Sequence, residues 1–239
     1  MIPGPKSEKI LKRIRRLDIG FADFYPYVHS KKGSGCYFTD IDGNEFLDFA
    51  SHIASNPLGY NHPELKKVVS NYTNMTPIKY AGQDFAITEH ADLLESLTSI
   101  TPRQLNSAIV VNSGAEAVEN CLKLALRKQE KGKFGIAFKN AFHGRTLGAL
   151  SCTCSKPVQK RNFLSIPVKH LPYDESALEK LEKIIHKTNS PKEVGFVIIE
   201  PAQGEGGYNF ASTKLIKGLR KITKQYNIPL ICDEVQSGV

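Results

Sequence analysis

The stretch AIVVNSGAEAVENCLKLAL, residues 108–126, decides the fold class. Its first four residues are apolar, which is typical of a short buried strand. Ser113 follows, with Glu116 three residues later, and this pair forms a capping box at the start of a helix. The apolar residues after Glu116 recur at helical spacing. The stretch therefore predicts a strand over 108–111 that turns directly into an amphipathic helix.

The same order of strand and helix returns downstream. Apolar runs predict strands at 134–138, 194–199 and 230–232. A second capping box, Ser176 with Glu179, marks another helix start. Helical spacing predicts two amphipathic faces, made of Leu178, Leu181 and Ile185 in one helix and Leu215, Leu219, Ile222 and Tyr226 in the next. Continuous apolar strands that alternate with such helices indicate an α/β fold with a mostly parallel sheet covered on both faces.

The N-terminal part has a different character. Asp42-Gly43 separates two alternating apolar runs within residues 36–49, which predicts a β-hairpin. Gly59 and Pro63 then interrupt the chain. We therefore expect an N-terminal segment over residues 1–60 and a larger domain over 61–239.

Composition narrows the class of protein. The chain has 239 residues, of which 41% are hydrophobic, as in ordinary globular proteins, and no apolar run is long enough to span a membrane. The net charge is +8, but the basic residues are scattered, so no nucleic-acid partner is expected. The basic stretch 12–16 has no apolar core after it and is interpreted as a solvated helix face. Five scattered cysteines indicate neither a disulfide framework nor a metal site, and we expect a cytoplasmic protein.

Ligands of parallel sheets bind beyond the carboxyl ends of the strands, so the loops that follow the predicted strands hold the candidate site. These loops are 112–115, 140–145, 200–207 and 233–238. Each of them alone has a plain structural interpretation: a helix cap, a core phenylalanine with polar neighbours, a glycine-rich turn, and a carboxylate paired with a lysine.

Together, however, the loops suit a phosphorylated pyridine ring. Small residues at 113–115 leave backbone N–H groups open to a phosphate at the helix start. Phe142 can stack on a flat ring, and Arg145 can hold a carboxylate in a two-pronged grip. Asp233 needs a positive partner where it is buried, and a protonated ring nitrogen would serve. No G-x-G-x-x-G motif or P-loop is present, which disfavours nucleotides.

Four segments resemble the class III aminotransferases, which depend on pyridoxal 5'-phosphate. They are NSGAEAVENCLKLAL (112–126), AFHGRTLG (141–148), IIEPAQGEGG (198–207) and DEVQSG (233–238), and DIDGNEFLDF (40–49) and GYNHPEL (59–65) are similar to the N-terminal part of the family. The resemblance implies a fold-type-I transferase that is a homodimer. It also implies transfer of an amino group from an amino acid, such as 4-aminobutyrate, ornithine or acetylornithine, to a 2-oxo acid.

The resemblance also implies roles for single residues. For the cofactor these are Ser113, Gly114 and Ala115 at the phosphate, Phe142 and Val235 on the two ring faces, His143 beside the ring, Gln236 at the phenolic oxygen, and Asp233 at the pyridine nitrogen. For the substrate they are Arg145 at a carboxylate, Glu205 as partner of a switching arginine, and Ile53 near the pocket, with Glu200 in support. Ser51-His52-Ile53-Ala54 departs from the Gly-Ile-Ala pattern of the family, which affects the pocket.

One departure concerns the catalytic lysine. In the family, the lysine that forms the Schiff base with the cofactor lies downstream of the DEVQ motif, whereas this sequence ends at Val239. We therefore expect a C-terminally truncated chain with an incomplete major domain and the N-terminal part of the small domain, and we expect this chain alone to be inactive. Two alternatives stay open: a racemase or aminomutase on the same fold, and an inactive fragment.

Overall fold

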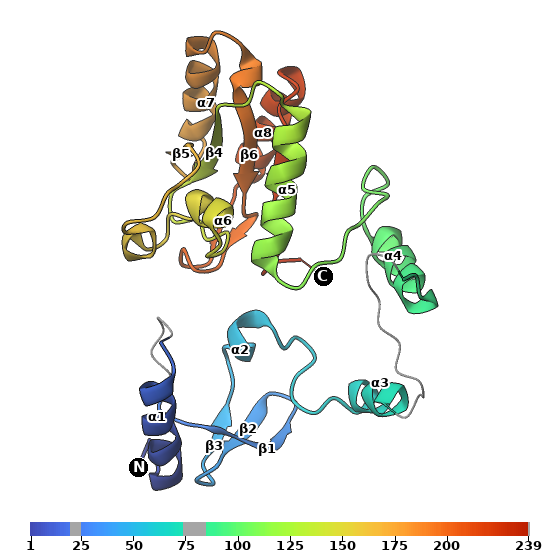
Figure 1. Ribbon diagram of the computed structural model, residues 1–239, viewed down its shortest axis with the longest axis vertical. Helices are drawn as coiled ribbons and strands as arrows, with labels where there is room; N and C mark the ends of the chain where they lie inside the picture. Colours follow the sequence, from blue (N-terminus) through green and yellow to red (C-terminus); the bar gives the residue numbers. More distant parts are fainter. Residues whose placement is uncertain (20–24, 74–84, 239) are drawn as a thin grey trace. The chain divides into compact units, whose positions relative to one another are not determined.

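The computed structural model describes residues 1–19, 25–73 and 85–238 (Figure 1). The chain divides into two compact units, Met1–Leu93 and Leu94–Val239. The boundary expected after residue 60 falls inside the first unit and stays a prediction.

The first unit contains an antiparallel sheet with the strand order β1-β2-β3. Its elements are α1 (Pro5–Leu17), β1 (His29–Ser34), β2 (Tyr37–Asp40), β3 (Glu45–Leu47), α2 (Ser51–Ala54) and α3 (Pro63–Thr73), and α4 (Thr88–Ile100) follows. Phe38 pairs with Phe46 across the turn, so the hairpin predicted at Asp42-Gly43 is confirmed. The carboxylate of Asp40 closes this turn by accepting hydrogen bonds from the N–H groups of Asp42 (2.9 Å) and Asn44 (2.8 Å).

The second unit is built on a parallel four-stranded sheet with the order β5-β4-β6-β9. Its strands are β4 (Phe134–Phe138), β5 (Val168–Leu171), β6 (Val194–Ile199) and β9 (Leu230–Cys232), and its α-helices are α5 (Gly114–Lys128), α6 (Leu147–Cys152), α7 (Ser176–Lys187) and α8 (Thr213–Gln225). Short helices η1 (Pro157–Lys160) and η2 (Pro191–Glu193) and a small ladder of β7 (Ala202–Gln203) with β8 (Asn209–Phe210) complete it. The three strands predicted at 134–138, 194–199 and 230–232 are confirmed.

Both faces of this sheet are covered, as the continuous apolar runs indicate. Val197 and Ile199 of β6 belong to a buried cluster with residues of α7 and α8, while Phe196 and Ile198 belong to a second cluster with residues of α5 and α6. Side chains alternate between the faces of a strand, so each face of β6 meets a different pair of helices (Figure 1). The α/β class with helices on both sides of a parallel sheet is therefore confirmed.

Two local predictions are wrong. Residues 108–111 form no strand, and within the described chain no β-ladder pairs with them; Ile109 is 66% exposed. Apolar composition alone does not make a strand, because the backbone also needs a neighbouring strand to pair with. The expected capping box of Ser176 and Glu179 does not form either. The N–H group of Ser176 instead donates to Asp174 Oδ1 (2.8 Å), and Glu179 pairs with Lys183.

Candidate active site

The capping box of Ser113 and Glu116 fixes the start of α5, which forms one side of the candidate site. Ser113 Oγ accepts a hydrogen bond from the N–H group of Glu116 (3.2 Å), and Glu116 Oε2 accepts one from that of Asn112 (2.7 Å). Gly114 and Ala115 thus form the first turn of α5, whose N–H groups have no carbonyl partner within the helix. The positive end of α5 therefore presents backbone donors beside the other loops.

Close contacts at glycines show that the four predicted loops meet at one edge of the sheet. A Cβ atom on Gly114 would lie 2.8 Å from Val235 Cγ1, and one on Gly204 would lie 1.2 Å from Gln236 Oε1. Gly144 has a φ of +125°, and a Cβ atom there would lie 2.8 Å from Ala115 Cβ. Only glycine allows these approaches, so the glycines of the loops serve packing between loops as well as turning.

A buried acid and imidazole lie at the centre of this edge. Asp233 follows β9, and its Oδ2 atom is 2.7 Å from Nδ1 of His143, with both side chains at most 5% exposed. The other oxygen, Oδ1, accepts a hydrogen bond from the N–H group of Val235 (3.1 Å). The described residues offer no hydrogen-bond partner to the buried Nε2 atom of His143. The pairing meets the requirement that a buried carboxylate be hydrogen-bonded, and it places the imidazole proton on Nδ1.

Thr153 holds the loop of His143 and was missed by the sequence analysis. Its buried hydroxyl accepts a hydrogen bond from the N–H group of His143 (2.9 Å) and lies 3.0 Å from the carbonyl oxygen of Gly144, to which it can donate. The hydroxyl lies ten residues from His143 in the sequence, and no motif marks it. Phe142, next to His143, is half-buried.

Glu200 supports the same loop from β6. Its Oε2 atom accepts a hydrogen bond from the N–H group of Phe142 (2.9 Å), and burial raises the pKa of its carboxyl group from 4.5 to about 7. The hydroxyl of Tyr173 donates to the backbone carbonyl of Glu200 (2.7 Å), which fixes the end of the strand. Glu200 is one of the residues predicted from the sequence, whereas no sequence motif marks Tyr173.

The raised pKa of Glu200 predicts a stability that falls with rising pH. Between about 4.5 and about 7 the folded state keeps a proton on this carboxyl that the unfolded state has lost. The free energy of unfolding should therefore decrease across this window, by up to about 1.4 kcal/mol per pH unit. In Glu200→Gln the amide still accepts from Phe142 but does not ionise. Urea unfolding at several pH values should show that the free energy of unfolding of the variant increases relative to that of the wild type as pH rises. A constant difference between the two free energies would contradict this account.

The predicted substrate residues of the second unit are more open. Arg145 is exposed, and so is Val235, a predicted cofactor residue, at 67%. Glu205 is also exposed, and its Oε2 atom is 3.6 Å from Nζ of Lys156, so in this structure its partner is a lysine and not an arginine. Exposed pairs of this kind contribute little to stability, at most about 1 kcal/mol, which leaves both side chains available to a ligand.

Ile53 lies in the first unit, in a turn of left-handed backbone. The four residues 51–54 have φ values of 47°, 52°, 59° and 59°, and Ile53 is 62% exposed. Left-handed backbone costs roughly 1–2 kcal/mol for each residue other than glycine, so the glycine of the family pattern would fit such a turn more easily. Asp48 supports the turn, because its Oδ1 atom accepts hydrogen bonds from the N–H groups of Ala50 and Ser51 (2.8 Å each).

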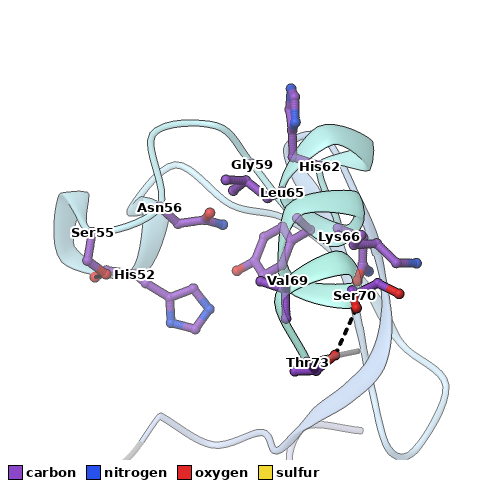
Figure 2. Close-up of a pocket in the computed structure, with 12 residues that line it drawn as sticks. His52, Ser55, Asn56, Gly59, His62, Leu65, Lys66, Val69, Ser70 and Thr73 are labelled. Atoms are coloured by element: carbon purple, nitrogen blue, oxygen red, sulfur yellow. Dashed lines mark hydrogen bonds between the residues drawn. The ribbon is translucent and has the colours of Figure 1, made fainter. Parts of the chain in front are cut away.

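The first unit also has an open depression of about 730 Å³. Figure 2 shows His52 of the left-handed turn on one side and Val69, Ser70 and Thr73 of α3 on the other. Ile53 does not line it, although its neighbour His52 does. The other predicted site residues belong to the second unit, so the candidate site is described from that unit alone.

The described residues contain neither a helix suited to span a membrane nor a cluster suited to a metal ion. No helix in the described ranges combines the length and the apolar composition that a bilayer requires. No cluster of three or more His, Cys, Asp or Glu side chains suited to a metal ion was found in the same residues.

A parallel sheet with an aromatic ring and a buried carboxylate at its strand ends, beside the start of a helix, is the plan of the fold-type-I pyridoxal-phosphate enzymes. The chain belongs to the class III aminotransferases: the family model described as "Aminotransferase class-III" matches residues 22–239. This family implies pyridoxal 5'-phosphate as cofactor, so the family and the cofactor expected from the sequence are both confirmed.

Sequence identity with individual relatives supports this family assignment. The chain is 32% identical to a probable mitochondrial 4-aminobutyrate aminotransferase of Caenorhabditis elegans, over 99% of this chain and 58% of that protein. It is 31% identical to a 4-aminobutyrate aminotransferase of Emericella nidulans, over 100% of this chain and 57% of the relative. The chain thus spans little more than half the length of these curated relatives.

Solved structures confirm the fold. An amine transaminase from an uncultivated Pseudomonas species, in its PLP-bound form, superposes with a TM-score of 0.79 at 25% identity, covering 89% of this chain and 52% of the other. The ornithine aminotransferase of Toxoplasma gondii gives a TM-score of 0.81 at 25% identity, covering 97% and 54%.

Proposed function

We propose that the protein carrying this sequence transfers an amino group from an amino acid to a 2-oxo acid with pyridoxal 5'-phosphate as cofactor. The donor is an ω-amino acid such as 4-aminobutyrate, ornithine or acetylornithine. The buried pair of Asp233 and His143 carries the proposal, because it keeps a carboxylate ready for a cationic ring at the strand ends. The names of the relatives support amino transfer and favour 4-aminobutyrate; nothing favours a racemase or an aminomutase.

The residues present fit this cofactor. The first turn of α5 offers backbone donors of the kind that bind phosphate, and Val235 lies against Gly114 at the same place. Asp233 is buried and hydrogen-bonded through both oxygens, so its carboxyl group is held in place at the strand ends, where a protonated pyridine nitrogen would need a partner. The buried Nε2 atom of His143, which has no partner among the described side chains and backbone, is a further polar group on this edge.

The proposed roles of single residues follow from these positions. Gly114 and Ala115 bind the phosphate through their N–H groups with Ser113 beside them; Phe142 and Val235 lie on the two ring faces; Gln236 donates to the phenolic oxygen; Asp233 holds the proton on the ring nitrogen. His143 orients Asp233, and Glu200 fixes the backbone of Phe142. When bound, the cofactor supplies an electron sink for the carbon that loses its proton.

The substrate residues follow the same reasoning. We propose that Arg145 holds the carboxylate of the donor, that Glu205 responds to the charge of the substrate, and that Ile53 borders the substrate pocket. Both Arg145 and Glu205 are exposed side chains of the loops that meet at the sheet edge, so a ligand can reach them. We also propose a homodimer. The cytoplasmic location stays a prediction, since the names of several relatives include the word mitochondrial.

The half-reaction tests the proposed function. Purified full-length protein saturated with cofactor should change its absorption spectrum when 4-aminobutyrate, ornithine or acetylornithine is added, and a 2-oxo acid should restore the first spectrum. Bound cofactor without a spectral response to any of these donors would overturn the proposal. Chiral analysis without an acceptor separates the alternatives, because a racemase changes the donor with no oxo acid present.

Arg145→Lys should raise the KM for 4-aminobutyrate roughly ten- to hundredfold, because lysine keeps the charge but loses the two-pronged hydrogen bond. Steady-state rates at varied donor concentration give this value. Arg161→Lys is the matched control, since Arg161 is another exposed arginine of the same unit. An unchanged KM in Arg145→Lys, or an equal rise in both variants, would remove Arg145 from the substrate site.

A further inference from the structure

Glu119 of α5 accepts three hydrogen bonds from the segment that follows Arg145. Its Oε1 atom lies 2.6 Å from Thr146 Oγ1, 2.8 Å from Gly148 N and 3.1 Å from Ala149 N. Gly148 and Ala149 belong to the first turn of α6, where N–H groups have no carbonyl partner within the helix. The N-cap residue Thr146 makes no capping hydrogen bond of its own. A carboxylate from α5 therefore caps α6.

Arg145 lies between two contacts that tie its segment to one face of α5. Ala115 and Glu119 are four residues apart and share that face. Before Arg145, Gly144 packs so closely on Ala115 that a Cβ atom would come within 2.8 Å of Ala115 Cβ. After Arg145, the hydroxyl of Thr146 donates to Glu119. Both neighbours of Arg145 are thus fixed to the same helix, while the side chain of Arg145 is exposed.

Gly148 is the residue that lets the carboxylate of Glu119 approach. A Cβ atom on Gly148 would lie 2.3 Å from Glu119 Oε2 and 2.9 Å from its Cδ. Any side chain at this position would push the carboxylate away from the N–H groups that it caps. Gly148 therefore offers a way to disturb the contact without changing Glu119 itself.

We infer that Glu119 is a positioning residue for Arg145 and, through it, a determinant of carboxylate recognition. The inference rests on the proposed function, since it takes Arg145 as the group that holds the carboxylate of the substrate. A two-pronged hydrogen bond from arginine tolerates little displacement, so the backbone on either side must be fixed. Glu119 acts through the backbone of residues 146–149 and not by contact with the ligand.

A double-mutant cycle on binding tests the inference. The probes are butanoate and butanamide, which have the same carbon chain, differ in the charge of the carboxylate, and carry no amine that reacts. Titrations of the cofactor-loaded protein followed by ligand NMR give both dissociation constants. Glu119→Ala should raise the dissociation constant of butanoate about tenfold and leave that of butanamide unchanged. In the Arg145→Ala background, the same substitution should not raise the dissociation constant of butanoate any further.

Additional variants guard against misfolding. Glu119→Gln keeps an oxygen that accepts from the N–H groups and should retain most of the affinity, whereas Gly148→Ala should reproduce the loss seen in Glu119→Ala. Amide exchange at positions 148 and 149 should speed up in Glu119→Ala and in Gly148→Ala but not in Glu119→Gln. Glu130→Ala, at an exposed glutamate outside these contacts, should bind butanoate as the wild type does.

The outcomes that overturn the inference are distinct. An equal loss of affinity for butanoate and butanamide would show that Glu119 has a general structural role. Binding free-energy changes of Glu119→Ala and Arg145→Ala that add fully in the double variant would show that Glu119 acts independently of Arg145. Either result leaves the proposed function in place. If Arg145→Ala alone binds butanoate as the wild type does, the proposed role of Arg145 fails and the inference fails with it.

Discussion

Asp233→Asn is expected to lower the rate of amino transfer about a thousandfold while the protein stays folded. The variant keeps the shape of the side chain and a hydrogen-bond acceptor for His143, but it loses the negative charge. Without that charge the pyridine nitrogen is no longer held in its protonated form, and the ring is a poorer electron sink. Rates of the half-reaction with 4-aminobutyrate under single-turnover conditions measure the effect directly.

Glu234→Gln is the control for this variant, because Glu234 is the next residue in the chain and its side chain is exposed. It should transfer amino groups at the rate of the wild type. A rate for Asp233→Asn within a few-fold of the wild type would remove Asp233 from its proposed role. Circular dichroism and urea unfolding of the variant show whether a loss of rate comes from the site or from the fold.

Phe196→Ala is expected to lower the free energy of unfolding by about 3–5 kcal/mol. Phe196 is fully buried in β6, and its ring fills the space over Gly135 on the neighbouring strand, where a Cβ atom would lie 2.1 Å from Phe196 Cζ. Removing the ring leaves a cavity that the packed helices α5 and α6 cannot close. Urea unfolding followed by circular dichroism measures the change.

Phe210→Ala gives the matched comparison, since Phe210 is 79% exposed in the same unit. This substitution should lower the free energy of unfolding by no more than about 0.5 kcal/mol. Similar losses for the two phenylalanines would contradict the two-faced core that places β6 between the helices.

The sequence predicts the two central strands and the edge strand β9, but not the other edge strand, β5. β6 and β4 are covered on both faces, so nearly every residue is apolar and the run stands out. β5 and β9 are the two edge strands; an apolar run marks β9, whereas β5 contains Lys169 and His170 and no continuous apolar run marks it. α6 has six residues, which is too short for a helical period to show. The wrong strand at 108–111 has the opposite cause: the composition fits, but no partner strand is present among the described residues.

The candidate site also contains residues that the sequence predicts and residues that it does not. Asp233, Phe142 and Arg145 are conspicuous because their chemistry is unusual at the ends of strands, and the structure brings their loops together. Thr153 and Glu119 act through hydrogen bonds to backbone that lies ten to thirty residues away in the sequence. Such partners follow from the path of the chain in space, and a single sequence carries no spacing that reveals them.

Label transfer tests the central claim most directly. The full-length, cofactor-loaded protein is given ¹⁵N-labelled 4-aminobutyrate, ornithine or acetylornithine with unlabelled 2-oxoglutarate, and the products are analysed by mass spectrometry. The account predicts glutamate that carries the label of at least one donor, formed in equal amount to the aldehyde or oxo product of that donor. Cofactor-loaded protein that forms no labelled glutamate from any of the three donors would contradict it.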